Sequence, residues 1–377
     1  MADREIVARV ESAVGSVPQA DWDRLAGGNP FTSHGFLTAL EDSGSVGPGT
    51  GWQSAPILLE EGGALTGALP AYLKGHSQGE YVFDHAWADA YERAGGSYYP
   101  KLQIAAPFTP ATGPRILAPD PAAAPLLLQA AEQLCRQNGF SGVHATFVTP
   151  AQVPLFEEAD WLRRTDVQFH WLNQGFGSFD DFLATLSSRK RKDLRKERAA
   201  AQDGVTIMHL RGGEIEPHHW DAFWTFYQDT GTRKWGRPYL KRSAFDLFAE
   251  RLGEQVLLIL ALVDETPVAG ALNFIGSDAL YGRYWGCILD KPFLHFELCY
   301  YQAIDLAIEL GLQRVEAGAQ GGHKLARGYE PVETVSAHWL ADPGFRAAVA
   351  DYLEQERRGI ALDRLHLAQR TPFRKGE

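Results

Sequence analysis

A histidine and a glutamate two positions apart, His295 and Glu297, are the first residues in this sequence that could do chemistry. They follow an aromatic, strand-like run at 280–286 and stand at the start of a helical pattern that extends to about residue 309. A histidine and a carboxylate beside the end of a strand can supply an acid and a base. Each also has a structural alternative, because a carboxylate in a first helical turn is favourable in any case and a histidine there can cap or pack.

A glycine-rich loop at 318–329 is the second candidate site, because it combines glycines with His323, Lys324 and Arg327. Its glycines are Gly318, Gly321, Gly322 and Gly328. Glycine lets the backbone approach a ligand closely, and exposed N–H groups beside cationic side chains suit an anion. The spacing fits neither a Walker A loop nor a dinucleotide-binding fingerprint. A plain turn with solvated charges is the alternative.

A third candidate is basic: the segment 189–198 holds seven of the chain's 36 lysines and arginines. In a chain whose formal net charge is −11, such a concentration favours a ligand that carries phosphate. The candidate phosphate-binding residues are Arg189, Lys190, Arg191 and Arg195. A solvated helix face with internal pairs to Asp193 and Glu197 is the alternative.

The segment 75–118 gathers aromatic and carboxylate side chains with neither the period of a strand nor that of a helix. We therefore expect structured loop and short strand there. A long ordered loop in a compact domain is more often functional, whereas a rigid aromatic brace needs only packing, and both remain open. The candidates for binding a donor or an acceptor are Asp84, His85, Trp87, Tyr99 and Lys101.

The elements that must position these residues follow from the local patterns. Strand, helix and strand succeed one another from 281 to 317, and such a unit requires parallel strands. Three runs at 256–263, 268–275 and 280–287, joined by tight turns, predict an antiparallel meander ahead of it, so the sheet is mixed. Ligands of open α/β sheets sit where the strands end, and the polar residues collect there.

Both halves of the chain run from helices through an antiparallel meander to a helix and a strand. We therefore predict the α/β class with mixed sheets and two domains, 1–174 and 175–377, the second including a basic helix at 187–202. No residue-level repeat relates the halves, so a duplication is suggested by architecture alone.

Composition narrows the function further. The chain of 377 residues is 45% apolar and 22% charged, which is typical of a globular protein with ample core. Its negative net charge argues against DNA as a partner. Three cysteines without metal-type spacing, and no recognised ligand set around His295 or His323, predict a reducing compartment and no metal. Residues 1–20 lack the features of a signal peptide and no stretch predicts a membrane span, so we expect a cytoplasmic protein.

Several of these motifs, in the same order over nearly the whole chain, resemble the FemAB-like group of predicted N-acyltransferases. That group is labelled as peptidoglycan biosynthesis or recognition and belongs to the GNAT acyltransferase superfamily. The resemblance rests on residues 79–91, 98–103, 107–113, 187–198, 282–286, 293–301 and 318–329. It implies two GNAT-like units side by side with a cleft between them.

The resemblance implies transfer of an acyl group from an activated donor, with acyl-CoA as the co-substrate and no tightly bound cofactor. The acceptor would be a small-molecule or peptide amine, deprotonated by His295 or Glu297, with Tyr284 as the acid for the departing group and His323 in the same catalytic set. Lys324 and Arg327 would hold donor phosphate or an acceptor carboxylate. The remaining expected binding residues in the loop are Gly321, Gly322 and Tyr329.

One feature departs from GNAT enzymes that use acyl-CoA, in which a glycine-rich loop before the crossover helix cradles the pyrophosphate. The corresponding segment here, 288–294, has no glycine. An aminoacyl-tRNA-dependent peptidyltransferase of Fem type is therefore one alternative, with tRNA as a less favoured partner because of the net charge. The other is a non-catalytic protein that binds a cell-wall precursor or peptide on an aromatic platform at 81–103. The oligomeric state is left open.

Overall fold

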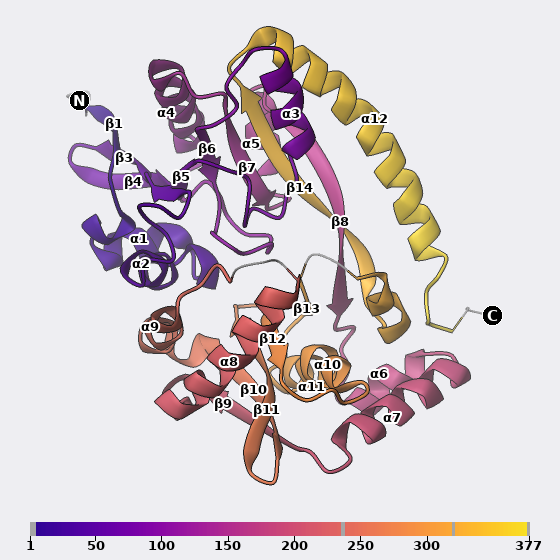
Figure 1. The fold of residues 1–377 in the computed structure, drawn as a ribbon. Helices are drawn as coiled ribbons and strands as arrows, with labels where there is room; N and C mark the ends of the chain where they lie inside the picture. The colour runs from indigo at the N-terminus through magenta and orange to yellow at the C-terminus, as the bar shows by residue number, and fades with distance from the viewer. Residues whose placement is uncertain (1–4, 235–237, 319–320, 375–377) are drawn as a thin grey trace. The chain divides into compact units, whose positions relative to one another are not determined.

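The chain forms two compact units, which Figure 1 shows as a ribbon. The structure is a computed structural model that describes residues 5–234, 238–318 and 321–374. Unit 1 contains residues 1–166 and 333–361, and unit 2 contains residues 167–332 and 362–377. The predicted boundary between residues 174 and 175 assigns 333–361 to the second domain, whereas this segment belongs to unit 1.

Unit 1 is built on two sheets. Its main strands follow one another in the order β2 (Trp52–Ser54), β5 (Ala71–Lys74), β6 (Lys101–Ile104), β7 (Gly142–Val148) and β14 (Glu330–Leu340). The smaller sheet has the order β1 (Ile6–Val10), β3 (Ile57–Glu61) and β4 (Ala64–Leu69). The helices are η1 (Val14–Ser16), α1 (Gln19–Ala26), η2 (Pro30–Thr32), α2 (His34–Asp42), α3 (His85–Arg93), α4 (Ala123–Asn138), α5 (Val153–Glu158) and most of α12 (Pro343–Ala368).

The strands of unit 2 follow the order β8 (Leu162–Leu172), β13 (Arg314–Glu316), β12 (Ala279–Cys287), β11 (Thr266–Ile275), β10 (Val256–Val263) and β9 (Thr206–Arg211). Its helices are α6 (Phe179–Thr185), α7 (Ser188–Gln202), η3 (Gly212–Glu214), α8 (Pro217–Lys234), α9 (Arg242–Leu252), η4 (Gly253–Gln255), α10 (Leu294–Phe296), α11 (Gln302–Glu309) and η6 (Gly322–Arg327). A π-helical turn, η5 (Glu297–Tyr301), joins α10 to α11. The predicted meander and the crossover to a parallel strand are confirmed, because β10, β11 and β12 pair antiparallel and β12 pairs parallel with β13.

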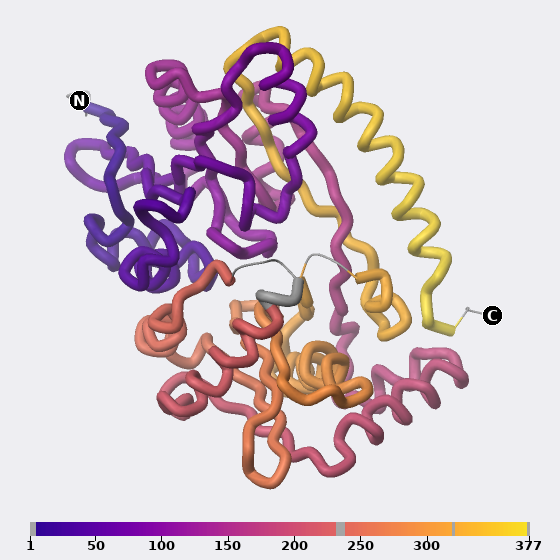
Figure 2. The backbone as a smooth tube through the Cα atoms, viewed as in Figure 1, coloured from indigo at the N-terminus to yellow at the C-terminus, as the bar shows by residue number. Residues whose placement is uncertain are grey.

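In each unit, one strand comes from the half of the sequence that mainly forms the other unit. β14 pairs antiparallel with β7 of unit 1, from Val335 opposite Val148 to Leu340 opposite Gly142. The end of β8 pairs antiparallel with β13 of unit 2, with Leu172 opposite Arg314. Figure 2 shows the late, yellow part of the chain running among the indigo and magenta elements of unit 1.

The two units share one pattern of pairing. In unit 1, β5 and β6 are antiparallel, β6 and β7 parallel, and β7 and β14 antiparallel. In unit 2 the same succession runs through β11, β12, β13 and β8. A separate apolar core supports each sheet: Leu102, Leu127 and Val143 belong to that of unit 1, and Ile259, Leu298 and Ile304 to that of unit 2.

One local expectation is corrected: the segment 75–118 contains a helix, α3, where loop and strand were expected. The basic helix expected at 187–202 is confirmed as α7, which begins at Ser188 after a separate helix, α6, ends at Thr185. The Ser187 backbone N–H between them donates to the carbonyl of Pro372, so tertiary pairing interrupts the helical pattern.

Candidate active site

The parallel strands β12 and β13 pair over three residues and then part. The pairs run from Ala279 opposite Arg314 to Tyr281 opposite Glu316. A pocket of about 140 Å³ opens where they separate; we call it the fork pocket. Its lining includes Asn273, Gly282, Tyr284, His295, Cys299 and Tyr300.

A β-bulge shapes one wall of the fork pocket. Opposite β11, the register pairs Asn273 with Gly282 but Leu272 with Tyr284, so β12 has one residue more than β11 at this point. A bulge bends the strand and re-aims its side chains, and such features are frequent beside active sites. It explains why Gly282, Arg283 and Tyr284 all line the pocket, because successive residues of a regular strand point to opposite faces.

The π-helical turn η5 forms the opposite wall. It carries Cys299 and Tyr300 into the lining, one turn after His295. The Tyr300 hydroxyl lies 2.8 Å from Nε2 of His323. Burial raises the pKa of Tyr300, so the phenol keeps its proton and can donate it. Single π-turns within helices often occur at functional sites.

The structure brings three of the predicted catalytic residues together. Tyr284 and His295 both line the fork pocket, and His323 is joined to it through Tyr300. The rings of His295 and His323 are 6.4 Å apart, centre to centre. The His295 ring also lies 5.1 Å from Trp285 and 5.4 Å from Tyr300. His295 is half-buried and His323 is exposed, so solvent reaches the pair.

Glu297, the other expected base, lies away from the fork pocket. Its side chain is fully buried and accepts hydrogen bonds from Arg198 at 3.0 Å, Gln202 at 2.8 Å and Gln302 at 2.6 Å. Arg198 in turn reaches Asp305 at 2.6 Å. A carboxylate enclosed by these donors anchors α7 to the π-helical turn, and it is not among the residues that line the fork pocket.

The loop cations are also structural. Lys324 is 1% exposed and donates to the carbonyl of Gly318, which lines the fork pocket, at 2.8 Å. Arg327 is buried, donates to Glu197 at 2.8 Å and lies over the Phe296 ring. Both side chains are buried and bonded within the protein, and their binding of an anion stays a prediction.

The other loop candidates have different surroundings. Gly321 has a φ of +124°, and a Cβ there would meet the His323 ring at 2.6 Å, so glycine is needed for that ring to pack. Gly322 is exposed, whereas Tyr329 is fully buried with its ring 5.5 Å from that of Tyr300.

The candidates in unit 1 lie around a buried ion cluster. Lys101, fully buried, donates to Asp84 at 2.5 Å, Glu80 at 2.8 Å and Ser77 at 2.8 Å. Burial alone would raise the pKa of Asp84, but Lys101 holds it below its usual value. Tyr99 reaches the cluster through Ser77, at 2.8 Å. Asp84 and Lys101 thus satisfy each other, and their role as direct ligands is not supported by this geometry.

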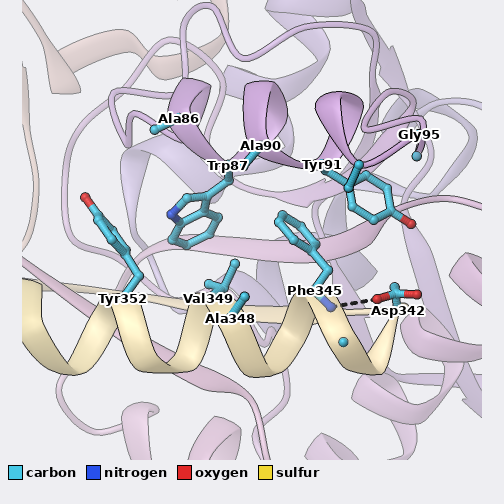
Figure 3. A pocket seen from close by; sticks show the side chains of 13 residues that line it. Ala86, Trp87, Ala90, Tyr91, Gly95, Asp342, Phe345, Ala348, Val349 and Tyr352 are labelled. Atoms are coloured by element: carbon cyan, nitrogen blue, oxygen red, sulfur yellow. Dashed lines mark hydrogen bonds between the residues drawn. The ribbon is translucent and has the colours of Figure 1, made fainter.

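Trp87 lines a second cavity, an apolar groove of about 700 Å³ between α3 and the start of α12 in unit 1. Figure 3 shows Trp87 and Tyr91 of α3 facing Phe345, Val349 and Tyr352 of α12. His85, the first residue of α3, is exposed and is not part of the lining. The predicted residues of unit 1 therefore do not form one site.

The basic side chains of α7 have different surroundings. Arg198 is anchored to Glu297 and Asp305, as described, whereas Arg189 and Arg195 are exposed. Arg195 pairs with Asp180 at 2.8 Å. Lys190 and Arg191 are half-buried. Phosphate binding by Arg189, Lys190, Arg191 and Arg195 stays a prediction.

Sequence reasoning missed Asn273, Cys299 and Tyr300. Asn273 stands alone among apolar residues of a central strand, where a polar side chain is unusual. That anomaly was the available signal. Cys299 and Tyr300 follow His295 by four and five positions, but the π-helical turn that brings Tyr300 to the pocket cannot be recognised from spacing.

Within the described ranges, no group of three or more His, Cys, Asp or Glu side chains is arranged to hold a metal ion. Nor does any described helix combine the length and apolar character needed to cross a bilayer.

Solved structures share this fold at low sequence identity. FemX is 13% identical with a TM-score of 0.56, covering 88% of this chain and 98% of that chain. The C-terminal domain of a putative lysylphosphatidylglycerol synthetase from Agrobacterium fabrum is 11% identical with a TM-score of 0.52, covering 89% and 96%. L-PGS from Bacillus licheniformis is 10% identical with a TM-score of 0.53, covering 95% and 98%. The expected mixed α/β fold is thereby confirmed.

A comparison with curated protein sequences finds no match. The family comparison is more specific: residues 13–375 match the FemAB-like family, described as peptidoglycan biosynthesis/recognition. That match spans nearly the whole sequence, both units included. The chain is therefore a member of the FemAB-like family.

Proposed function

We propose that this chain is an N-acyltransferase that moves an acyl group from acyl-CoA to an amine at the fork pocket. Family membership and the shared fold support a transferase of the acyltransferase type. One observation carries the finer proposal. A histidine, a tyrosine and a tyrosine–histidine pair converge on a small pocket where two parallel strands part. These groups are the acids and bases that acyl transfer between a thioester and an amine requires.

The roles follow from position and protonation. The acceptor amine enters in its neutral form, and His295, in the pocket wall, takes the proton that the nitrogen loses as it attacks the carbonyl carbon, directly or through water. Attack forms the carbon–nitrogen bond, and collapse of the tetrahedral intermediate breaks the carbon–sulfur bond. The departing thiolate then takes a proton from Tyr300, and His323, 2.8 Å from the hydroxyl, returns one to the phenol. Tyr284 is the second candidate acid.

The donor's phosphates would lie at the start of α10. Here a helix of three continuous elements, α10, η5 and α11, begins directly beside the fork pocket. The N-terminus of a helix favours anions through its dipole and its N–H groups. No glycine precedes it, but Phe293 has a φ of +65°, the left-handed conformation that glycine usually supplies.

Unit 2 is favoured over unit 1 for the reaction. In unit 1 the parallel strands β6 and β7 also part after Ile104. There the chain itself occupies the fork: Gly113 bridges to Val148, and buried Arg115 donates to the carbonyls of Thr146 and Ala111. The equivalent place in unit 2 is a pocket. The family description suggests a cell-wall precursor or peptide as the acceptor.

An aminoacyl donor is the second candidate. It is favoured by the family description and by the exposed cations Arg189 and Arg195 on α7, which suit a phosphate backbone. The chemistry at the fork pocket would be the same, with an ester in place of the thioester. A steep salt dependence of tRNA binding would support this donor.

The test measures release of the CoA thiol from a set of acyl-CoAs, with primary amines or peptides as acceptors. We expect His295→Ala and His323→Ala each to lower turnover at least tenfold while the far-UV spectrum is unchanged, as is usual for a lost general acid or base. His218→Ala is the matched control, because that side chain is 65% exposed and outside the pocket. Full turnover in the folded double variant would refute the assignment.

A further inference from the structure

Asn273 places an unusual group in the wall of the fork pocket: a buried acceptor with no donor. Its side chain is fully buried on β11, and its Oδ1 receives no hydrogen bond from the residues that the structure describes. Buried polar atoms nearly always have a partner. An orphan acceptor on a pocket wall therefore points to a donor that arrives with the ligand.

The orientation of this amide is settled by its other contact. The Nδ2 group lies 3.1 Å from the carbonyl oxygen of Ala271. A carbonyl can only accept, so the nitrogen must face Ala271 and the oxygen must be the atom on the other side. That oxygen lies next to Gly282: a Cβ built on this glycine would be 3.4 Å from it. Gly282 and Asn273 both line the pocket.

The bulge fixes Asn273 at this position. Asn273 is opposite Gly282 in the register, at the point where the pairing of β11 and β12 shifts. The glycine has no side chain to lie over the amide, and Oδ1 is buried beside it without a donor. The acceptor is therefore held rigidly by a strand next to a glycine, an arrangement suited to a binding group.

We propose that Asn273 Oδ1 receives an N–H group of the ligand in the fork pocket, and so selects substrates that carry an amine or amide at this depth. If the proposed function is correct, the N–H belongs either to the acceptor amine or to an amide of the acyl donor's arm. An acceptor amine becomes cationic as it attacks, so the hydrogen bond would strengthen along the reaction and orient the nitrogen lone pair toward the carbonyl carbon.

The first experiment asks only whether the pocket selects an N–H. N-methylacetamide and N,N-dimethylacetamide are titrated into the ¹⁵N-labelled protein, with the backbone amide of Gly318 in the pocket wall as reporter. We expect the N–H compound to bind at least about threefold more tightly, as one neutral hydrogen bond implies. Equal binding would overturn the proposal.

Two variants tie the selectivity to Asn273. Asn273→Leu keeps the volume and removes the acceptor. Gly282→Ala keeps the acceptor but covers it, and its new methyl group fits, because the nearest other atoms, of Ala317 and Glu316, are 3.7 Å away. Both should abolish the preference for N-methylacetamide. A preference that survives in both variants would overturn the proposal.

Stability separates a binding role from a structural one. Because Oδ1 is unsatisfied without ligand, Asn273→Leu should leave the melting temperature of the free protein within about 3 °C of wild type. A much larger drop, with unchanged selectivity in Gly282→Ala, would show that Asn273 is structural and overturn the proposal.

The last measurement identifies the source of the N–H. If Asn273→Leu loses the increase in melting temperature that CoA causes in wild type, the N–H is on the donor. If that increase is retained and the KM for a primary amine such as glycinamide rises at least tenfold, the N–H is on the acceptor. Either result supports the proposal. If the wild-type protein selects N-methylacetamide but neither binds CoA nor consumes acyl-CoA, the binding role of Asn273 is supported and only the proposed function is refuted.

Discussion

Glu297 shows how a residue with a catalytic profile in the sequence can be needed for stability instead. Its buried carboxylate holds Arg198, Gln202 and Gln302. Glu297→Ala would leave the arginine with only Asp305 as its anionic partner. We expect a loss of about 3–5 kcal/mol in the free energy of unfolding, measured in urea, because removing one partner strands a buried charge. Asp305→Asn should cost less, since Asp305 is 33% exposed. Unchanged stability together with abolished turnover would instead indicate that Glu297 has a catalytic role.

Lys324 provides a prediction of pH dependence at the same scale. Burial lowers the pKa of its ammonium group to about 8, against 10.5 in the unfolded chain. Between these values the unfolded state binds more protons, so the contribution of Lys324 to stability rises with pH and is least below pH 8. Across pH 8 to 10.5 the wild type should gain about 3 kcal/mol relative to Lys324→Met. Parallel stability curves for the two proteins would contradict this assignment.

At the scale of elements, two paired glycines let α8 lie close against the sheet of unit 2. Gly270 of β11 is opposite Gly286 of β12. A Cβ on Gly286 would be 2.1 Å from the backbone oxygen of Phe226 in α8, and one on Gly270 would be 2.8 Å from the Phe223 ring. The helix backbone cannot move aside as a flexible side chain can, so these glycines set the distance between helix and strand.

Gly286→Ala should therefore destabilise the protein by about 3 kcal/mol or more, at the upper end of the cost of overpacking. Gly282→Ala on the same strand is the matched control, since its methyl group meets no atom closer than 3.4 Å. Chemical denaturation of the two variants compares them directly. Similar midpoints would mean that α8 is not held as closely as described.

Elements formed by local pattern could be predicted from the sequence, and those formed by distant pairing could not. The apolar runs and tight turns of β10 to β12 specify a meander by themselves. The pairing of β14 with β7 joins residues nearly 200 positions apart, and nothing in the sequence of either strand identifies the other as its partner. The same holds for the candidate site. Residue type alone was enough to select His295 and Tyr284, which line the fork pocket. The burial of Glu297 could not be predicted, because it depends on Arg198, which lies on another helix.

At the scale of the whole molecule, the end of the chain returns to stabilise unit 2. Phe373 bridges Leu186, the Ser187 N–H donates to Pro372 at 3.1 Å, and the Arg374 N–H donates to Thr185 at 3.0 Å. The Phe373 ring also packs against the core of unit 2. The terminal residues thus close the gap between α6 and α7 with backbone hydrogen bonds that these two helices do not make with each other.

A chain ended after Arg370 should expose that junction. We expect amide hydrogen exchange at residues 183–191 to become at least tenfold faster, because local opening no longer breaks these hydrogen bonds or uncovers Phe373, and tenfold corresponds to about 1.4 kcal/mol. Exchange in α4 of unit 1 should stay unchanged, since that helix packs in a separate core. Phe373→Ala, which keeps the backbone bonds, should give a smaller increase. Equal exchange in the shortened and full-length chains would mean that α6 and α7 hold their places without the terminal segment.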